Sequence, residues 1–311
     1  MKKKGIFLVV IACFFWGTMG ITSRNLDIVG LDSFTIAFFR AAIAGIVYLL
    51  FVLKRDKSLL KTNRKDLIFF FIYGIVALGF SFIGYSLAVS RIPIAVATVL
   101  LFTNPIWVII INRICFKEKI KIKELVAIVV TIFGCMLIVK LFDLKATQLD
   151  MVGILVGMFA GAAFALQIVL PKFHNTGYKK DTLLVYGFMS ATIFLSFFVD
   201  FKGLITSVTN YNNLGFVISN ILAIALLSTF ISNVAYVKAT DYIDTSLISI
   251  LVSLEIIVAS IFAYFIFNET LESSQLVGMG IVIFAVIMLQ VDIKFSEFFK
   301  KSQKVHIKKL N

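Results

Sequence analysis

Long uncharged stretches constrain this 311-residue chain more than any other feature of its sequence. Runs of 18 to 24 residues without Asp, Glu, Lys or Arg occupy 5–23, 67–90, 92–112, 151–171, 182–199 and 273–291. A helix needs about 20 mainly apolar residues to cross about 30 Å of hydrocarbon. Each run is therefore predicted to be a membrane-spanning helix, and the continuous apolar pattern argues against a barrel of alternating strands.

Four further stretches are nearly as apolar: 34–53, 125–142, 214–237 and 245–268. They complete a predicted set of ten spans, although single charged residues interrupt three of them. The composition requires lipid as the solvent, because 60% of the residues are hydrophobic whereas soluble domains contain about 45–50% apolar residues. We therefore predict an all-α membrane protein with ten transmembrane helices.

The basic residues predict how the spans are oriented. Of the 30 Lys and Arg residues, 24 lie in 1–4, 54–66, 113–124, 172–181, 238–244 and 294–311, and five lie in the alternate loops. Basic residues accumulate in cytoplasmic loops, so both termini are predicted to face the cytoplasm from a cell membrane. The net charge of +13 is thereby explained by topology and lipid contacts, and we expect no nucleic-acid partner.

The sequence gives no basis for a metal site, a cofactor or a disulfide framework. Only two His and three Cys residues are present, and the cysteines fall in or beside apolar runs. No loop is long enough for a separate catalytic domain. We expect a monomer or a homodimer.

An internal repeat appears when the sequence is shifted by 151 residues. Residues 85–133 then share twelve identities with 236–284, including Tyr85 with Tyr236 and Glu118 with Glu269. Each predicted half holds five spans, an odd number, so the second half enters the membrane from the opposite side. We predict two inverted five-helix repeats, 1–147 and 148–293, followed by a basic cytoplasmic tail, 294–311. Inverted repeats are a common construction of secondary transporters.

Several short motifs, in this order, resemble the EamA family of the drug/metabolite transporter (DMT) superfamily. They are the Trp16-Gly17 pair, Asn104-Pro105, Lys117-Glu118-Lys119, Leu254-Glu255-Ile256 and Asn268-Glu269-Thr270. Ile256 stands where the family pattern has a proline. The resemblance covers nearly the whole chain and implies a ten-helix fold that exports or imports small metabolites, often amino acids.

Glu255 is the strongest candidate site residue, because a carboxylate at the bilayer centre costs about 2.5–3.5 kcal/mol on insertion scales. It can couple transport to a proton or bind a cationic substrate group, or it can be a structural hydrogen-bonding group. Asn104 is its partner under the 151-residue shift, and its alternative role is an interhelical hydrogen bond. Both lie midway along predicted spans.

Further candidates form polar or aromatic positions on other spans. Ser81 and Tyr85 repeat as Ser232 and Tyr236, with Asn233 beside them, and they either line a polar pathway or pack helices near the membrane interface. Arg40 either binds a substrate carboxylate or extends its guanidinium to the interface. Trp16, Trp107 and Gln167 are candidate wall residues, with core packing or lipid contact as the alternative.

The sequence therefore predicts a secondary transporter that moves a small polar or amphipathic metabolite, with export favoured, by alternating access. A flippase for lipids or lipid-linked sugars on the same fold is the alternative. An intramembrane enzyme is disfavoured because the spans contain no His/Asp pair and no nucleophile–base pair. We expect a small-molecule substrate, a coupling proton and membrane lipids as partners.

Single-cysteine labelling of intact cells tests the predicted topology. In a variant lacking Cys13, Cys115 and Cys135, we expect an impermeant maleimide to label cysteines placed in 24–33 or 268–274. Lys301→Cys should react only after lysis, because the basic tail is cytoplasmic. Labelling of residue 301 from outside would overturn both the orientation and the inverted repeat.

Overall fold

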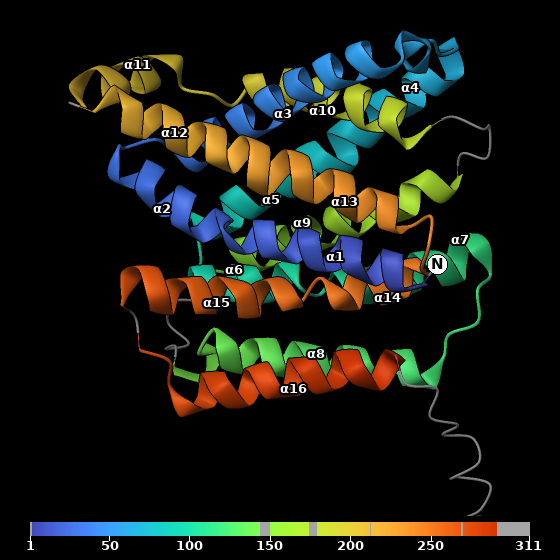
Figure 1. Cartoon of the computed structure of the whole chain (residues 1–311). Helices are drawn as coiled ribbons and strands as arrows, with labels where there is room; N and C mark the ends of the chain where they lie inside the picture. Colours follow the sequence, from blue (N-terminus) through green and yellow to red (C-terminus); the bar gives the residue numbers. More distant parts are fainter. Residues whose placement is uncertain (1, 144–149, 174–178, 212, 269, 291–311) are drawn as a thin grey trace, which may run out of the picture.

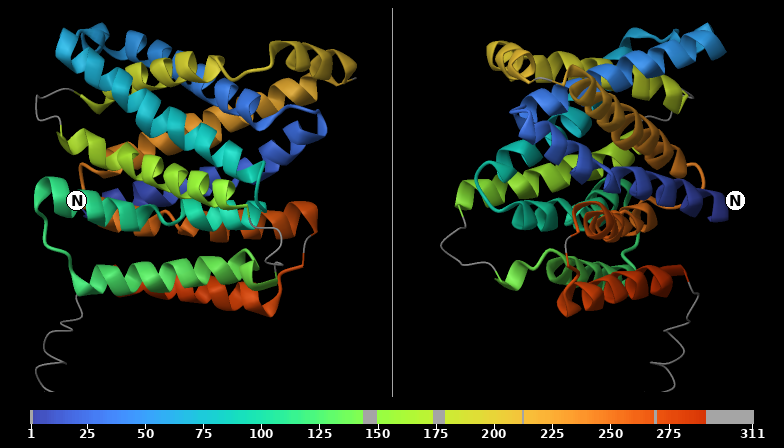
Figure 2. Two further views of the ribbon diagram at one scale, coloured as in Figure 1. Left: turned by 180° about the vertical axis from the view of Figure 1, so that it is seen from behind. Right: turned by 60° about the vertical axis from the view of Figure 1, so that its left-hand side comes forward.

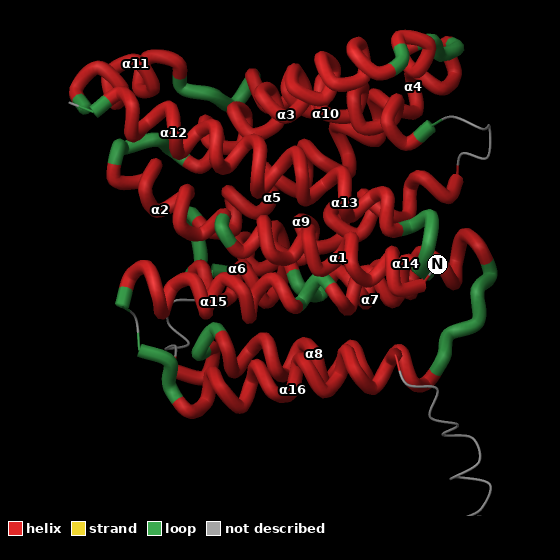
Figure 3. Tube along the Cα trace, viewed as in Figure 1, coloured by secondary structure: helices red, strands yellow, loops and turns green. Residues whose placement is uncertain are grey.

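The structure, a computed structural model, describes residues 2–143, 150–173, 179–211, 213–268 and 270–290. These residues form helices joined by turns and loops, with no strand among them (Figure 3). The predicted tail, 294–311, lies outside the described residues. The α-helices of the first half are α1 (Lys2–Gly17), α2 (Met19–Ile28), α3 (Ser33–Arg55), α4 (Arg64–Tyr73), α5 (Phe80–Val89), α6 (Ile94–Leu101), α7 (Asn104–Phe116) and α8 (Ile122–Ile138). Those of the second half are α9 (Met151–Val169), α10 (Lys180–Ser196), α11 (Phe201–Asn210), α12 (Leu214–Ala225), α13 (Ser232–Ala239), α14 (Thr245–Leu251), α15 (Leu254–Phe267) and α16 (Ser273–Gln290).

Within the described residues, seven helical segments are long and apolar enough to cross a membrane, so the chain is a multi-pass membrane protein. They are Lys2–Ile28, Ser33–Arg55, Arg64–Val89, Ile94–Phe116, Met151–Phe173, Leu214–Ala239 and Thr245–Phe267. Helices α10 and α11 form an eighth candidate that is bent by 91°.

The predicted count of ten spans rests further on α8 and α16, which are shorter. Helix α8 has 17 residues, about 26 Å at 1.5 Å per residue, and α16 has 18. The two helices pack along each other (Figure 1). The prediction of ten spans remains open on this point.

Several spans are interrupted at corresponding places in the two halves. A π-helical turn occupies Gly74–Gly79 between α4 and α5, and another occupies Leu226–Ile231 between α12 and α13. Short breaks separate α6 from α7 and α14 from α15. The helices after these breaks are followed by C-cap residues Lys117 and Asn268, which are 151 residues apart and both have left-handed backbone conformations.

The contacts between helices repeat in the two halves, where α1, α13 and α15 take the places of α9, α5 and α7. Helix α1 packs on α13 and α15, and α9 packs on α5 and α7. Helix α3 packs on α10, and α8 packs on α16. Further views show the α8–α16 pair as a layer of its own beside the remaining helices (Figure 2). The N-terminus and the end of α16 lie at the same end of the bundle, which we call the amino-terminal end (Figure 1).

Glycines on α9 allow α6 to approach closely. A Cβ atom on Gly157 would lie 2.8 Å from Cδ1 of Leu100, and one on Gly161 would lie 2.7 Å from the backbone oxygen of Leu100. A backbone atom cannot rotate away, so position 161 tolerates no larger residue without a shift of the helices. Such small residues are characteristic of close packing between membrane helices.

Gly161→Ala should therefore destabilise the protein by about 1–3 kcal/mol, the usual range for overpacking. Gly280→Ala is a matched control, because a Cβ atom at Gly280 meets nothing within 4 Å and alanine favours a helix. Thermal unfolding of the purified variants in detergent measures the difference. Equal melting temperatures for the two variants would contradict the close contact at Gly161.

Candidate functional site

A cavity of about 440 Å³ lies inside the bundle, between helices of both predicted halves. Its walls come from α1, α2, α3, α5, α6, α9, α13 and α15. Asp27 and Ser33 beside the α2–α3 turn and Phe267 at the end of α15 line it. These segments lie at the end of the bundle opposite the N-terminus (Figure 1). The volume is that of a small-molecule site.

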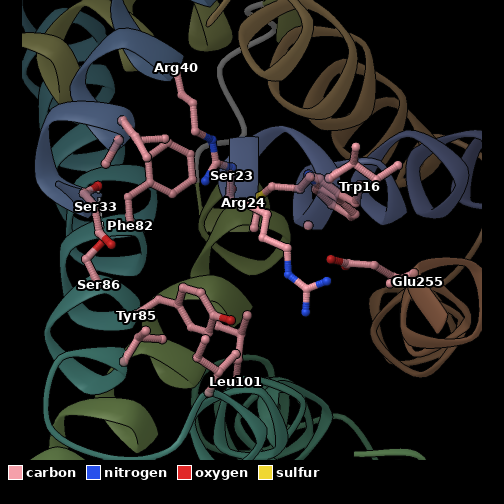
Figure 4. Close-up of a pocket in the computed structure, with 18 of the residues that line it drawn as sticks. Trp16, Ser23, Arg24, Ser33, Arg40, Phe82, Tyr85, Ser86, Leu101 and Glu255 are labelled. Atoms are coloured by element: carbon pink, nitrogen blue, oxygen red, sulfur yellow. Dashed lines mark hydrogen bonds between the residues drawn. The ribbon is translucent and has the colours of Figure 1, made fainter. Parts of the chain in front are cut away.

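Close packing of α1 on α15 forms one wall of this cavity. A Cβ atom on Gly17 would lie 2.6 Å from Cγ1 of Val258 and 3.1 Å from the backbone nitrogen of Ala259. The absence of a side chain at Gly17 therefore brings Trp16 and Glu255 to the same wall. Both side chains are seen there in Figure 4.

Glu255 lies in the first turn of α15, directly after the break at Val252 and Ser253. A helix N-terminus favours a negative charge, which gives this carboxylate a local stabilisation inside the membrane. Its side chain extends into the cavity (Figure 4). The carboxylate forms no ion pair and no hydrogen bond with the described residues, and its place in the cavity lining lets an incoming ligand or proton reach it.

Arg40 reaches the same cavity from α3 (Figure 4). Its Nε donates a 3.0 Å hydrogen bond to Oγ1 of Thr229, and its guanidinium lies 4.6 Å from the centre of the Phe82 ring. Both contacts hold the guanidinium in place at the cavity wall. Arg40 and Glu255 are close enough to attract each other electrostatically, but they form no ion pair within 4 Å.

Tyr85 and Ser81 come from α5, one turn apart. The Tyr85 hydroxyl lies 3.2 Å from Oγ1 of Thr98 on α6, and Tyr85 is within electrostatic range of both Arg40 and Glu255. Ser81 is buried and lines the cavity. These two residues add hydroxyl groups to a cavity wall that also carries the charged residues Arg24, Asp27, Arg40 and Glu255.

Three aromatic rings pack at the inner side of the cavity. Trp16 contacts Phe164 and Tyr236 edge to face, with ring centroids 5.7 and 5.1 Å apart, and Phe164 stacks on Tyr236 at 5.5 Å. Trp16 and Phe164 line the cavity, whereas Tyr236 is fully buried behind them. The rings form an apolar floor.

Gln167 and Asn233 flank this floor and bind backbone carbonyls of helical interruptions. Gln167 donates from Nε2 to the Ala77 oxygen at 3.2 Å, in the first π-helical turn. Asn233 donates from Nδ2 to the Thr229 oxygen at 2.8 Å, in the second. A carbonyl only accepts, so both amide nitrogens face the backbone and both amide oxygens are left over. Neither oxygen has a hydrogen-bond partner among the described atoms.

The remaining predicted site residues do not line the cavity. Asn104 is fully buried, and its side chain donates to the Leu101 oxygen at 3.3 Å. In a regular helix this oxygen would accept from the backbone N–H of residue 105, which is absent because residue 105 is a proline. Ser232 donates to the Leu227 oxygen at 3.0 Å. Trp107 is partly buried against the main hydrophobic core. These three side chains serve helix interruptions or packing. The internal repeat alone does not show whether a residue lines the cavity or is buried between helices.

Sequence reasoning missed Arg24 and Asp27, two charged residues of α2 that line the cavity, and three further residues that shape the site. Thr229 accepts from Arg40 and donates to the Ile224 oxygen at 2.9 Å. Phe82 packs against Arg40, and Phe164 belongs to the floor. Thr229 was detectable as a polar residue inside an apolar span, whereas the two phenylalanines were hidden among 33 in the chain.

Charged residues hold the amino-terminal end of the bundle together. Lys172 contacts Oε1 of Glu118 at 3.0 Å and Oδ1 of Asn112 at 3.1 Å. Lys238 pairs with Asp181 at 2.8 Å, and Asp181 also accepts from the Tyr48 hydroxyl at 2.5 Å. These contacts join helices of both halves on the side away from the cavity. Among the described residues, no group of three or more His, Cys, Asp and Glu side chains could hold a metal ion.

Comparisons with known proteins agree with the motif-based resemblance. The profile described as the EamA-like transporter family matches residues 3–140 and again 151–291. An uncharacterized transporter of Clostridium kluyveri is 25% identical, over 92% of this chain and 93% of its own. A solved structure described only as a crystal structure of protein has a TM-score of 0.76 at 12% identity. It covers 93% of this chain and 97% of its own, and the match concerns the fold alone.

Two relatives carry names that state a substrate. An S-adenosylmethionine uptake transporter of Rickettsia bellii is 29% identical, over 83% of this chain and 84% of its own. The pseudopaline exporter CntI of Pseudomonas aeruginosa is 26% identical, over 56% of this chain and 61% of its own. One name states uptake and the other export, so the relatives agree on transport and differ in direction and substrate.

Thr229→Val should lower the free energy of unfolding by about 1–3 kcal/mol, because it leaves Nε of Arg40 and the Ile224 oxygen without a partner. Thr229→Ser is the matched control, since it keeps the hydroxyl group. The melting temperatures of the purified variants measure the effect. A valine variant as stable as the serine variant would show that this hydroxyl does not support Arg40.

Proposed function

We propose that this chain, which belongs to the EamA-like transporter family, is a secondary transporter that moves a small metabolite through the cavity by alternating access. The substrate is a polar or amphipathic compound of amino-acid size. Export across the cell membrane is the favoured direction. The family assignment also confirms the resemblance read from the motifs.

The position of Glu255 carries this proposal. An acidic side chain inside a membrane span is costly and usually faces a water-filled pathway or a partner. Here it lines a cavity of substrate size, opposite a basic side chain, without a bound counter-ion among the described residues. A purely structural carboxyl group would instead be expected to make a hydrogen bond to a neighbouring helix.

The arrangement of the two halves supports alternating access. Interruptions recur at matching places, and exchanging the halves preserves the main helix contacts. We propose that residues 1–147 and 148–293 are inverted five-helix repeats with ten spans in all. In such transporters, the site lies between the repeats, and one repeat moves against the other.

The position of the cavity indicates which side is open in this conformation. The cavity is lined near the end of the bundle opposite the N-terminus, and ion pairs of Lys172 and Asp181 join helices at the amino-terminal end. Ion pairs of Arg91 with Asp150 and of Lys140 with Glu272 also join the two halves, outside the cavity lining. With a cytoplasmic N-terminus, this conformation faces outward. Alternating access then requires the contacts of Lys172 and Asp181 to separate when the cavity opens to the cytoplasm.

Glu255 supplies the coupling group in this proposal. Its carboxyl group takes up a proton when the cavity faces one side and releases it on the other, and each change alters the charge of the site. Asn104, its counterpart in the first half, has no acidic group and serves to cap the interrupted helix. Glu255 then provides one proton-binding position in each cycle, and Asp27, beside the α2–α3 turn, is a second acidic group in the lining of the cavity.

Glu255→Gln should abolish accumulation driven by a pH gradient while leaving exchange of substrate across the membrane intact. Purified protein in liposomes, tested with labelled amino acids under an imposed gradient and then without one, separates the two activities. Glu272→Gln is the control, because this carboxylate pairs with Lys140 outside the cavity. A glutamine variant that accumulates substrate like the parent would make Glu255 structural. Movement of labelled lipid in place of amino acids would favour the flippase.

A further inference from the structure

We infer that α11 lies in the membrane interface at the end of the bundle opposite the N-terminus (Figure 1). Phospholipid covers one exposed side of this helix, and another side packs on the rim of the cavity. The inference concerns a surface outside the transport site and does not rest on the proposed function. It makes α11 neither the second half of a broken span nor a loop that re-enters the bilayer.

The direction of α11 follows from the end of α10. Residues 182–199 carry no charge, and Asp200 then accepts hydrogen bonds from the backbone N–H groups of Lys202 and Gly203, both at 3.1 Å. Asp200 is therefore an N-cap that starts a new helix. Helix α10 packs along α3, one of the seven candidate spans, and α11 leaves α10 at 91°. A helix at a right angle to a membrane-spanning helix runs along the plane of the membrane.

The residues of α11 are sorted by polarity around the helix axis. Phe201, Leu204, Ile205 and Val208 fall within an arc of about 100°, which is the width of one apolar side. Leu204 and Val208 are partly buried, whereas Phe201 and Ile205 are exposed. A helix with one apolar and one polar side is the kind that lies at the boundary between lipid headgroups and acyl chains.

The exposed apolar side of α11 continues the lipid-facing surface of α10. Met189, Ile193 and Phe197 are spaced by four residues and are all exposed, Phe197 by 81%. Phe201 and Ile205, which is 63% exposed, extend this surface onto α11. Exposed apolar side chains of a span contact acyl chains, and aromatic residues gather where a span reaches the interface. Phospholipid is therefore the partner that fits this surface.

The other exposed side of α11 argues against a position inside the hydrocarbon. Lys202, Thr206 and Thr209 lie there, and all three are exposed. A helix that re-entered the bilayer would bring the ammonium group of Lys202 into lipid, which is costly. At the interface, the same side faces headgroups and water.

The remaining side of α11 packs on the α2–α3 turn, which forms part of the cavity rim. Leu204 and Val208 pack on a buried cluster that includes Leu31, and Leu31 also lines the cavity. Ser207 donates from Oγ to the Gly30 oxygen at 3.1 Å. Gly30 has a φ of 84°, a conformation that glycine adopts easily. Helix α11 therefore connects the membrane surface to the rim of the cavity.

Spin labels on neighbouring residues test the position of α11. In a Cys115→Ser background, whose other two cysteines are buried, a nitroxide is attached to Ile205→Cys or to Thr206→Cys in the full-length protein in phospholipid liposomes. Collisions with oxygen, which concentrates in hydrocarbon, are compared with collisions with a water-soluble nickel complex. We expect oxygen to dominate at position 205 and nickel at position 206.

A label on Gly280→Cys is the reference for hydrocarbon, because Gly280 is exposed on α16 and a Cβ atom there meets nothing within 4 Å. Nickel dominating at both positions of α11 would place the helix in water and overturn the inference. Oxygen dominating at both would place it inside the hydrocarbon. Protection of position 205 from both reagents would show that protein, such as a second copy of the chain, covers this side instead of lipid.

The connection to the cavity rim has a separate test. Ile205→Asp should weaken the contact of α11 with lipid, so the backbone amides of 26–33 should exchange hydrogen severalfold faster in liposomes. Thr206→Asp is the matched control and should leave this exchange unchanged, because its side chain faces away from lipid. Equal exchange in the two variants would contradict a rim supported by α11. Neither measurement depends on transport, so a failure here leaves the proposed function unaffected.

Discussion

The need to satisfy every backbone hydrogen bond in lipid controls this structure. Hydrocarbon offers no donor or acceptor, so spans are helical, and any interruption must have its freed carbonyls bound by protein groups. The two π-helical turns and the two mid-span breaks are such interruptions. Side chains of Gln167, Thr229, Asn233 and Asn104 bind carbonyls at them. These polar side chains within the spans therefore stabilise the helix interruptions, whatever further role they have.

This structural task also creates the candidate site. The break before α15 puts Glu255 at a helix N-terminus, and the second π-helical turn presents Thr229 to Arg40. The amide nitrogens of Gln167 and Asn233 donate to backbone carbonyls at the interruptions, and their amide oxygens have no hydrogen-bond partner among the described atoms. The same interruptions that would weaken a regular helix therefore gather charges and acceptors around one cavity. Helix breaks near the midplane serve this purpose in many transporters.

The breaks before α7 and α15 are accompanied by different residues in the two halves. In the first half, Pro105 accompanies the break, and Thr103 donates to the Leu100 oxygen at 2.6 Å. In the second half, Ile256 replaces proline, yet the helix is still broken and Ser253 donates to the Ile250 oxygen at 2.6 Å. The second break therefore forms without a proline, with a local serine hydrogen bond at its carbonyl. Of the two equivalent positions after the breaks, Asn104 and Glu255, only the second carries an acidic group.

The sequence by itself determined that the chain is helical, crosses the membrane many times and belongs among EamA-like transporters, because apolar length, loop charge and motif order are local properties. It also pointed to Glu255, Arg40, Tyr85 and Gln167 as polar positions in apolar spans. Tertiary structure decided which of the candidates share a cavity. Asn104, Ser232 and Tyr236 satisfy the same patterns, yet they are buried elsewhere. The reason is physical: whether a polar side chain faces a cavity or a carbonyl depends on how neighbouring helices are bent, and no single span encodes that.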